Sequence, residues 1–197
     1  MPRDPASPVT PERLRQAAVY CIQHRGYAAT TARDVTTRAE ANLASIGYHF
    51  GSMESLLDEA LVIATESWID PLVALATEAD GESDNGSDRL RRGLKTFLES
   101  LPENRQTAVG LFEALARVDR SEPLRERLAA QYDRLRAALA GNAAGDARAD
   151  ATASAVVALL DGVVIQWLID GQALPEPDLM VEGLARMLCA ATGQSGD

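Results

Sequence analysis

The stretch "TTARDVTTRAEANLASIGYHFGS", residues 30–52, decides the fold of this chain. Thr31 is followed three residues later by Asp34, the spacing of a reciprocal N-terminal cap, which predicts a helix of at most about nine residues. Asn42 can cap a second short helix over residues 43–49. Two short capped helices joined by about three residues predict a helix-turn-helix.

The second short helix has two different faces. Helical spacing predicts that Leu43, Ile46 and Phe50 face inward. The opposite face is expected to carry small or hydrogen-bonding side chains, namely Ala44, Ser45 and Tyr48. In a helix-turn-helix, the N-terminal turn of the second helix enters the major groove, and exposed amides and hydroxyl groups contact phosphates.

Longer helices are predicted on both sides of this pair. The first begins at Thr10 and Pro11 and ends at Gly26. Its expected inward residues are Leu14, Ala18, Cys21 and Ile22. Another helix begins after Ser52 and is expected to bend or stop near Pro71. Its expected inward residues include Leu57, Ala60, Leu61, Ala64 and Trp68.

The rest of the chain repeats the helical pattern without a sheet signal. The segment "ADGESDNGSD", residues 79–88, predicts a loop. Further helices are expected at about 88–101, 103–118, 122–140, 147–171 and 177–192. The predicted fold is therefore all-α with about nine helices. We expect a disordered tail over 1–9, a DNA-binding domain over 10–51 and a regulatory domain over 52–197.

Charge is unevenly distributed along the 197 residues, whose net charge is −10. Residues 1–50 contain six arginines and four acidic residues, which gives +2, whereas the remainder carries −12. An acidic body repels a polyanion, so any nucleic-acid contact is expected within the first fifty residues. A solvated surface would explain the modest +2 equally well.

Several function classes are disfavoured. No apolar run reaches the length of a membrane span, and the N-terminus lacks the apolar core of a secretory signal. Cys21 and Cys189 are interpreted as buried free thiols, so we expect a cytoplasmic protein. With only His24 and His49, and without a phosphate loop or nucleophile motif, we expect neither an enzyme nor a bound metal or cofactor.

Residues 13–57 resemble the TetR family of bacterial transcriptional repressors. Four features occur in family order and spacing: Gly26-Tyr27, the double threonine at 30–31, Asp34-Val35, and Tyr-His-Phe-Gly-Ser at 48–52. The resemblance implies that the family's DNA-contacting positions correspond to Thr31, Asn42, Ala44, Ser45, Tyr48 and His49 in this sequence. We add the neighbouring residues Leu43 and Gly47. The complete set of candidate contacts is Thr31, Asn42, Leu43, Ala44, Ser45, Gly47, Tyr48 and His49.

Three departures from the family pattern affect this expectation. Glu40 occupies the usual turn glycine, so it must adopt an unusual backbone angle near phosphates. Met53 replaces the usual lysine, and Gly47 costs the recognition helix roughly 1 kcal/mol relative to alanine. Together they predict DNA binding with a shallow salt dependence.

The C-terminal part resembles TetR regulatory domains more loosely. The resemblance implies a homodimer formed by the last two helices, with Val164, Trp167, Leu168, Leu184, Met187 and Leu188 as candidate interface residues. A monomeric helical core is the alternative. The resemblance also implies a pocket for a small, apolar or aromatic effector. Its candidate residues are Trp68, Phe97, Phe112, Glu113, Asp161, Gln166 and Trp167, although aromatic residues at helical spacing more often belong to a core.

The favoured function is thus a ligand-responsive repressor that binds a palindromic duplex DNA operator as a dimer and is released by its effector. The alternative is a helical small-molecule-binding protein that has lost DNA recognition, which Glu40 and Met53 keep open. Activation of transcription is a further alternative to repression.

Overall fold

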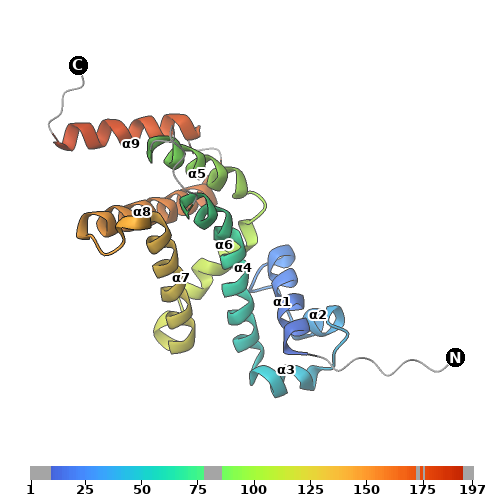
Figure 1. The fold of residues 1–197 in the computed structure, drawn as a ribbon. Coiled ribbons are helices and arrows are strands. Elements are labelled where there is room, and N and C mark those ends of the chain that lie inside the picture. Colours follow the sequence, from blue (N-terminus) through green and yellow to red (C-terminus); the bar gives the residue numbers. More distant parts are fainter. Residues whose placement is uncertain (1–9, 78–85, 172–173, 175, 193–197) are drawn as a thin grey trace. The chain divides into compact units, whose positions relative to one another are not determined.

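The structure is a computed structural model that describes residues 10–77, 86–171, 174 and 176–192. The expected tail over residues 1–9 lies outside these ranges. Nine α-helices and two 3-10 helices, Val118–Arg120 and Gly141–Ala143, make up the described chain (Figure 1). The α-helices are α1 (Pro11–Arg25), α2 (Ala32–Arg38), α3 (Leu43–Phe50), α4 (Met53–Thr77), α5 (Gly86–Ser100), α6 (Arg105–Leu115), α7 (Glu122–Ala140), α8 (Ala147–Ile169) and α9 (Pro177–Thr192).

The predicted helix starts in the N-terminal region are confirmed. The side chain of Thr10 accepts a hydrogen bond from the Arg13 amide, and Pro11 occupies the first turn of α1. The Ser52 hydroxyl oxygen accepts a hydrogen bond from the Ser55 amide at 3.0 Å, which caps α4. These short-range caps satisfy amides that the helix itself leaves unpaired.

Two sequence-based boundaries differ from the structure. Helix α4 continues through Pro71 to Thr77, so it does not stop at the proline. Helix α5 begins at Gly86, within the segment predicted as a loop, and residues 78–85 lie outside the described ranges. Of the predicted loop, residues 86–88 are therefore helical, and the prediction for residues 79–85 falls outside the described ranges.

The chain forms two compact units. Unit 1 comprises residues 1–68 and 103–131, and unit 2 comprises residues 69–102 and 132–197. Helices α4 and α7 each contribute residues to both units. In unit 1, α6 and parts of α4 and α7 pack with the N-terminal helices, and the expected boundary between DNA-binding and regulatory domains at residue 51 stays a prediction.

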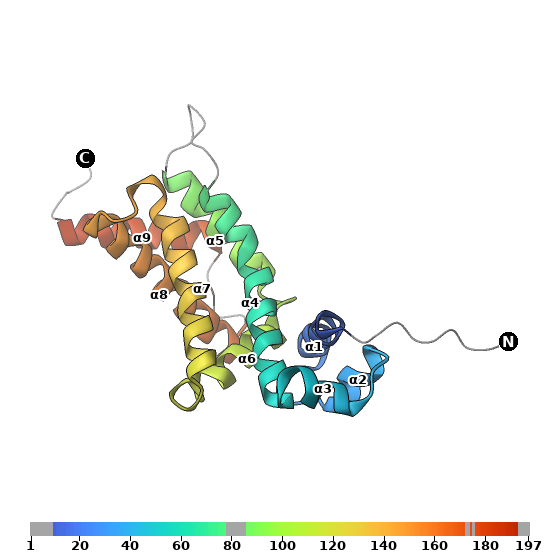
Figure 2. The ribbon, with the colours of Figure 1, turned by 60° about the horizontal axis from the view of Figure 1, so that its bottom comes forward.

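The core of unit 1 joins the three N-terminal helices to α4, α6 and α7. All inward residues predicted for α1 and for the first part of α4 are buried. Leu14, Ile22, Leu56 and Leu61 are fully inaccessible to solvent, and Leu124 of α7 is 1% exposed. Burial of several large aliphatic side chains stabilises the unit by roughly 1.5–3 kcal/mol for each one. Figure 2 shows α1, α2 and α3 gathered beside the first turns of α4.

Unit 2 contains the end of α4, then α5, the second part of α7, α8 and α9. Helices α5 and α9 pack together, and an ion pair joins Arg91 to Asp178 at 2.8 Å. By length and composition alone, α4 and α8 could each cross a membrane, although neither contains an uninterrupted apolar run of that length. In α4 much of this apolar surface lies in the core, where Leu56, Ala60 and Leu61 are inaccessible to solvent.

Candidate DNA-binding site and ligand cavity

Helix α2 is fixed at its start by the predicted capping box. The Asp34 amide donates to Thr31 Oγ1 at 3.2 Å, and the Thr31 amide donates to Asp34 Oδ2 at 3.0 Å. Hydrogen bonds from Thr31 are the main reason that the pKa of Asp34 is lowered, with a further contribution from the nearby Arg25. The Asp34 carboxylate therefore stays charged and holds the first turn of α2.

The turn between α2 and α3 contains the predicted unusual residue. Glu40 has φ of 51°, in the left-handed region that favours glycine. The Ala41 amide donates to the Thr36 carbonyl at 2.8 Å and closes the turn. The Glu40 carboxylate is exposed and accepts a hydrogen bond from Arg13 at 3.3 Å.

Helix α3 is capped by Asn42 and anchored by Ile46. Asn42 Oδ1 accepts hydrogen bonds from the Ser45 amide at 2.9 Å and from the Ser45 hydroxyl at 3.0 Å. Ile46 is 4% exposed, and Phe50 packs partly against the core beneath the Arg15 guanidinium, which lies 5.2 Å from its ring centre. The cap and the two apolar anchors hold the outer face of α3 toward solvent.

Most candidate DNA contacts lie on this outer face. Thr31, Asn42, Leu43, Ala44, Gly47 and Tyr48 are exposed, whereas Ser45 and His49 are half-buried. Tyr48 is 85% exposed and contacts the edge of the His49 ring. The inward orientation predicted for Leu43 is wrong, because 62% of Leu43 is exposed at the first position of the helix. The core beneath α3 begins one turn later, at Ile46.

A polar network holds the helix-turn-helix against the rest of unit 1. The Tyr27 hydroxyl donates to Asp58 Oδ1 at 2.7 Å, and Arg117 donates to both Asp58 and Glu54. The Arg117 guanidinium also lies over the Tyr27 ring. Burial is the largest cause of the raised pKa of Tyr27, and the adjacent Asp58 carboxylate adds to it. Tyr27 therefore remains a neutral hydrogen-bond donor.

Ion pairs occupy most of the arginines near the proposed DNA contacts. Arg13 pairs with Glu40, Arg25 with Asp34, and Arg15 with Glu59. Burial alone raises the pKa of Glu59, but hydrogen bonds from Arg15 and Arg127 outweigh it, and the net pKa is lowered. Arg33 is exposed on α2 and pairs with no residue that the structure describes. Sequence reasoning missed Arg33, although it follows Thr31 by two positions.

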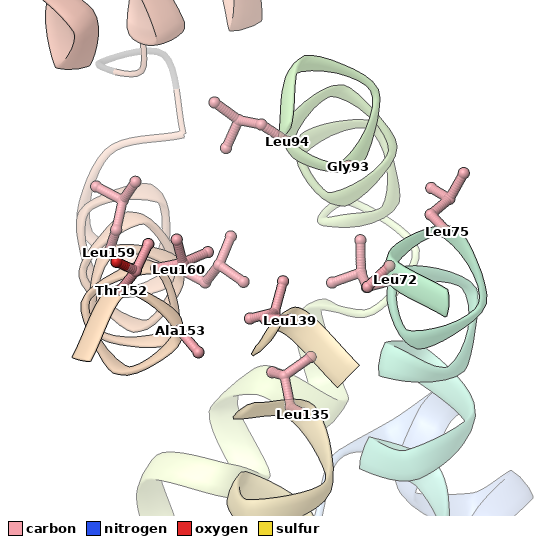
Figure 3. Close-up of a pocket in the computed structure, with 12 residues that line it drawn as sticks. Leu72, Leu75, Gly93, Leu94, Leu135, Leu139, Thr152, Ala153, Leu159 and Leu160 are labelled. Atoms are coloured by element: carbon pink, nitrogen blue, oxygen red, sulfur yellow. The ribbon is translucent and has the colours of Figure 1, made fainter. Parts of the chain in front are cut away.

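Unit 2 contains an apolar cavity of about 280 Å3 between α4, α5, α7 and α8. Figure 3 shows the side chains of Leu72, Leu139 and Leu160 pointing toward one another from α4, α7 and α8. The complete lining is Leu72, Leu75, Ala76, Gly93, Leu94, Leu135, Leu139, Thr152, Ala153, Val156, Leu159 and Leu160. Only Thr152 contributes a polar side chain, and its hydroxyl donates to the Arg148 carbonyl at 2.9 Å.

The seven residues predicted to line a pocket do not line this cavity. Trp68, Phe112 and Glu113 belong to unit 1, whereas Phe97, Asp161, Gln166 and Trp167 belong to unit 2. Trp68 and Phe97 are 7% and 4% exposed and serve as core residues. Asp161 accepts a hydrogen bond from the Tyr132 hydroxyl at 3.1 Å, and Gln166 is exposed. Helical spacing indicates which residues lie on the apolar face of a helix. It does not indicate which of these residues line a cavity.

The candidate residues of the dimer interface differ in how far they are exposed. Val164 is 5% exposed and packs inside its own chain, so it cannot offer much surface to a partner. Trp167 and Leu168 are half-buried. The side chains of Leu184, Met187 and Leu188 lie outside the described residues. Ile165 and Ile169, which are 44% and 82% exposed, were not among the candidates, although their i, i+4 spacing was visible in the sequence.

Family models match both parts of the chain. Residues 14–60 match the model of bacterial regulatory proteins of the tetR family. Residues 86–191 match the C-terminal model of BetI-type transcriptional repressors, which covers more than half of the chain. The chain belongs to the TetR family. It is therefore a transcriptional regulator with a helix-turn-helix DNA-binding region and a ligand-binding C-terminal region.

Solved structures similar to this TetR-family chain cover nearly its whole length. The multidrug binding protein EbrR complexed with proflavin is 29% identical, with a TM-score of 0.66, and the match covers 89% of this chain and 97% of that one. A regulator from Saccharomonospora viridis in complex with choline is 26% identical, with a TM-score of 0.64 and coverage of 90% and 94%.

A TetR-family member from Streptomyces coelicolor A3 is 28% identical, with a TM-score of 0.65 and coverage of 89% and 95%. Comparison with curated protein sequences gives no significant match. Among the residues that the structure describes, no group of three or more His, Cys, Asp or Glu side chains is placed to hold a metal ion.

Proposed function

We propose that this TetR-family regulator is a homodimeric repressor that binds a palindromic operator and is released by a small, uncharged aliphatic effector. One observation carries the proposal. Helix α4 begins directly after the recognition helix α3, and its last turns supply Leu72, Leu75 and Ala76 to the apolar cavity. A ligand in the cavity therefore contacts the same helix that follows the DNA-binding residues.

The outer face of α3 supports the DNA-binding part of the proposal. Leu43, Ala44 and Gly47 are exposed and present small or apolar groups to a groove. Tyr48 and Arg33 are exposed donors suited to phosphate oxygens. One short helix reads few bases, so two copies reading half-sites about one helical turn apart are needed for specificity.

Helix α8 supports the dimer. Its residues Ala151, Ala155, Ala158, Gly162, Ile165 and Ile169 alternate in spacing between four and three. We call this set the α8 stripe. This spacing is typical of a helix that packs along a partner helix, and small residues permit close approach. All members of the stripe are exposed except Gly162, which is half-buried. A stripe with two exposed isoleucines favours a partner over open solvent.

The dimer is tested by Gly162→Arg. A Cβ atom at Gly162 would meet nothing within 4 Å, so the new side chain can leave the helix without an immediate clash, and circular dichroism verifies that the protomer still folds. A charged side chain in the α8 stripe should convert the protein to a monomer and abolish operator binding. Sedimentation and DNA-binding measurements check this, with Gly93→Ala on α5 as the matched control. A G162R protein that remains dimeric would contradict the proposed interface.

The cavity lining supports an effector class. Proflavin and choline, which occupy related proteins, are both cations. A cation entering this cavity would lose hydration without gaining a carboxylate or an aromatic ring among the described lining residues. Because the Thr152 hydroxyl already donates to Arg148, its oxygen remains free to accept. The best fit is an uncharged aliphatic molecule with one donor, such as an alcohol.

Operator release tests the effector. The operator is first selected from a random duplex library, and its affinity is then measured with 1-octanol, octylammonium, choline and proflavin. We expect 1-octanol to weaken binding at much lower concentration than the three cations. Equal or stronger action by a cation would contradict the effector class. Failure of the protein to select any duplex would favour the alternative, a ligand-binding protein without DNA recognition.

The site of effector action is tested by Gly93→Leu. Gly93 lies at the cavity, and a Cβ atom there would meet nothing within 4 Å. The leucine side chain should fill part of the cavity and abolish the response to 1-octanol while operator binding persists. Gly93→Ala, which adds only a methyl group, serves as the control and should retain most of the response.

A further inference from the structure

The exposed face of α3 is unusual for a helix that must distinguish bases by hydrogen bonding. Helix α3 contains no arginine, lysine, glutamine or asparagine. Its first two residues are Leu43, which is 62% exposed, and Ala44, which is also exposed. These residues occupy the N-terminal turn, the part of a recognition helix that lies against base edges.

The polar groups nearest this turn are already engaged. Asn42 Oδ1 accepts two hydrogen bonds from Ser45, and the Ser45 hydroxyl hydrogen is used in one of them. Asn42 therefore cannot present the paired acceptor and donor that adenine recognition requires while it caps the helix. Tyr48 lies more than one turn further along α3, at the end better suited to phosphate contact.

We infer that α3 reads its half-site through the C5-methyl groups of thymine, with Leu43 as the principal specificity-determining residue and Ala44 as its neighbour. The inference rests on the proposed function, since it assigns the basis of base selection to the same surface. Thymine is the only base that offers a methyl group in the major groove, and apolar side chains are its natural partners.

The charge distribution favours duplex DNA over another protein as the occupant of this apolar turn. Residues 1–50 carry a net charge of +2, whereas the remainder of the chain carries −12. The exposed Arg33 lies on α2, the neighbouring helix of the same motif. An exposed apolar turn on α3, with an exposed arginine on the adjoining helix α2, suits a groove whose floor carries methyl groups and whose rims carry phosphates.

Uracil substitution in the operator tests the inference, because it removes only the methyl group. After the operator is selected from a random duplex library, each thymine of a half-site is replaced by uracil and affinity is measured by fluorescence anisotropy. Loss of one buried methyl contact should weaken binding about fourfold, and symmetric replacement in both half-sites about fifteenfold. At least one thymine in each half-site should behave in this way.

Leu43→Ala identifies the residue that contacts the methyl group. Because Leu43 is exposed, the variant should fold normally, which circular dichroism verifies. L43A should bind the thymine operator more weakly and should no longer distinguish thymine from uracil at that position. Tyr48→Phe is the matched control: it should bind more weakly but keep the full thymine preference.

The outcomes separate the two proposals. Equal affinity of the wild-type protein for thymine and uracil at every position would overturn the inference while leaving DNA binding intact. Retention of the uracil penalty by L43A would also overturn it, because another residue would then contact the methyl group. Absence of binding to any selected duplex would overturn the proposed function itself.

Discussion

At the scale of single residues, Glu40 shows how a turn can be retained without its usual glycine. Its φ of 51° carries a conformational cost of roughly 1–2 kcal/mol for a residue with a Cβ atom. The ion pair with Arg13 is exposed and offsets little of this cost. Glu40 also places a negative charge within the motif proposed to approach phosphates.

Glu40→Gly should therefore raise the free energy of unfolding by up to about 1 kcal/mol and tighten binding to duplex DNA of any sequence. Glu40→Gln separates the two effects, because it removes the charge but keeps the strained backbone. We expect E40Q to tighten DNA binding without a gain in stability. Thermal melting and DNA titration measure both. Weaker DNA binding by E40G would show that Glu40 has a positive role.

Asp161 gives a second residue-scale prediction, on the pH dependence of stability. Burial is the main cause of its raised pKa, and the Tyr132 hydrogen bond opposes the rise. Below the unfolded-state pKa of about 3.9, Asp161 is protonated in both states and has no effect. As the pH rises, the unfolded chain ionises first, so stability falls until the folded-state pKa is passed.

Asp161→Asn removes this ionisation, and its oxygen can still accept the Tyr132 hydrogen bond. D161N should therefore be more stable than wild type at pH 7, and the difference should shrink toward zero as the pH falls below about 4. Urea denaturation over this pH range measures it. Tyr132→Phe removes the hydrogen bond that lowers the pKa of Asp161, so its free energy of unfolding should fall more steeply with rising pH than that of the wild type. A pH-independent difference for D161N would contradict the assignment.

At the scale of elements, Gly110 allows α6 to approach α4 and the loop after α1 closely. A Cβ atom at Gly110 would lie 3.0 Å from Leu61 Cδ1 and 3.1 Å from Tyr27 Cβ. Neither neighbour can easily move, since Leu61 is fully buried and Tyr27 is fixed by its bond to Asp58. The spacing between α6, α4 and the loop after α1 therefore depends on the absence of a side chain.

Gly110→Ala should destabilise unit 1 by about 1 kcal/mol, because overpacking of roughly 1–3 kcal/mol exceeds the helix-propensity gain of about 1 kcal/mol. Displacement of α6 should also weaken operator binding. Gly93→Ala provides the control, because a Cβ atom there meets nothing within 4 Å and only the propensity gain remains. If G110A and G93A changed the melting temperature alike, α6 would be free to adjust.

At the scale of the whole molecule, the helix caps could be predicted from the sequence. The packing of the helices against one another could not. Thr10, Thr31 and Asn42 cap helices through bonds to residues three positions away, so their spacing was sufficient evidence. The exposure of Leu43 depends on where the core beneath α3 begins. The cavity depends on how α4, α5, α7 and α8 are spaced, which helical periodicity does not encode.

The last whole-molecule prediction concerns salt. Arg13, Arg15 and Arg25 are paired with carboxylates, and Arg38 lies over the Tyr20 ring. Few cations remain free to displace counterions from DNA, so a dimer with about two to four ionic contacts should give a slope of log K against log salt of roughly −2 to −4. Operator titration between 50 and 300 mM salt, as approximate limits, measures this slope.

Met53 occupies a position where a cation could contact DNA, and its substitution tests whether the missing charge makes the salt dependence shallow. Met53 packs against the core, so the position normally suited to a cation contributes apolar contact instead. A lysine there can keep its aliphatic stem on the core and extend its charge to a phosphate. Met53→Lys should therefore steepen the slope by about 2 per dimer. Ala130→Lys adds the same charge on α7 and should change the slope much less. Equal slopes for M53K and wild type would mean that the first turn of α4 lies away from the DNA backbone.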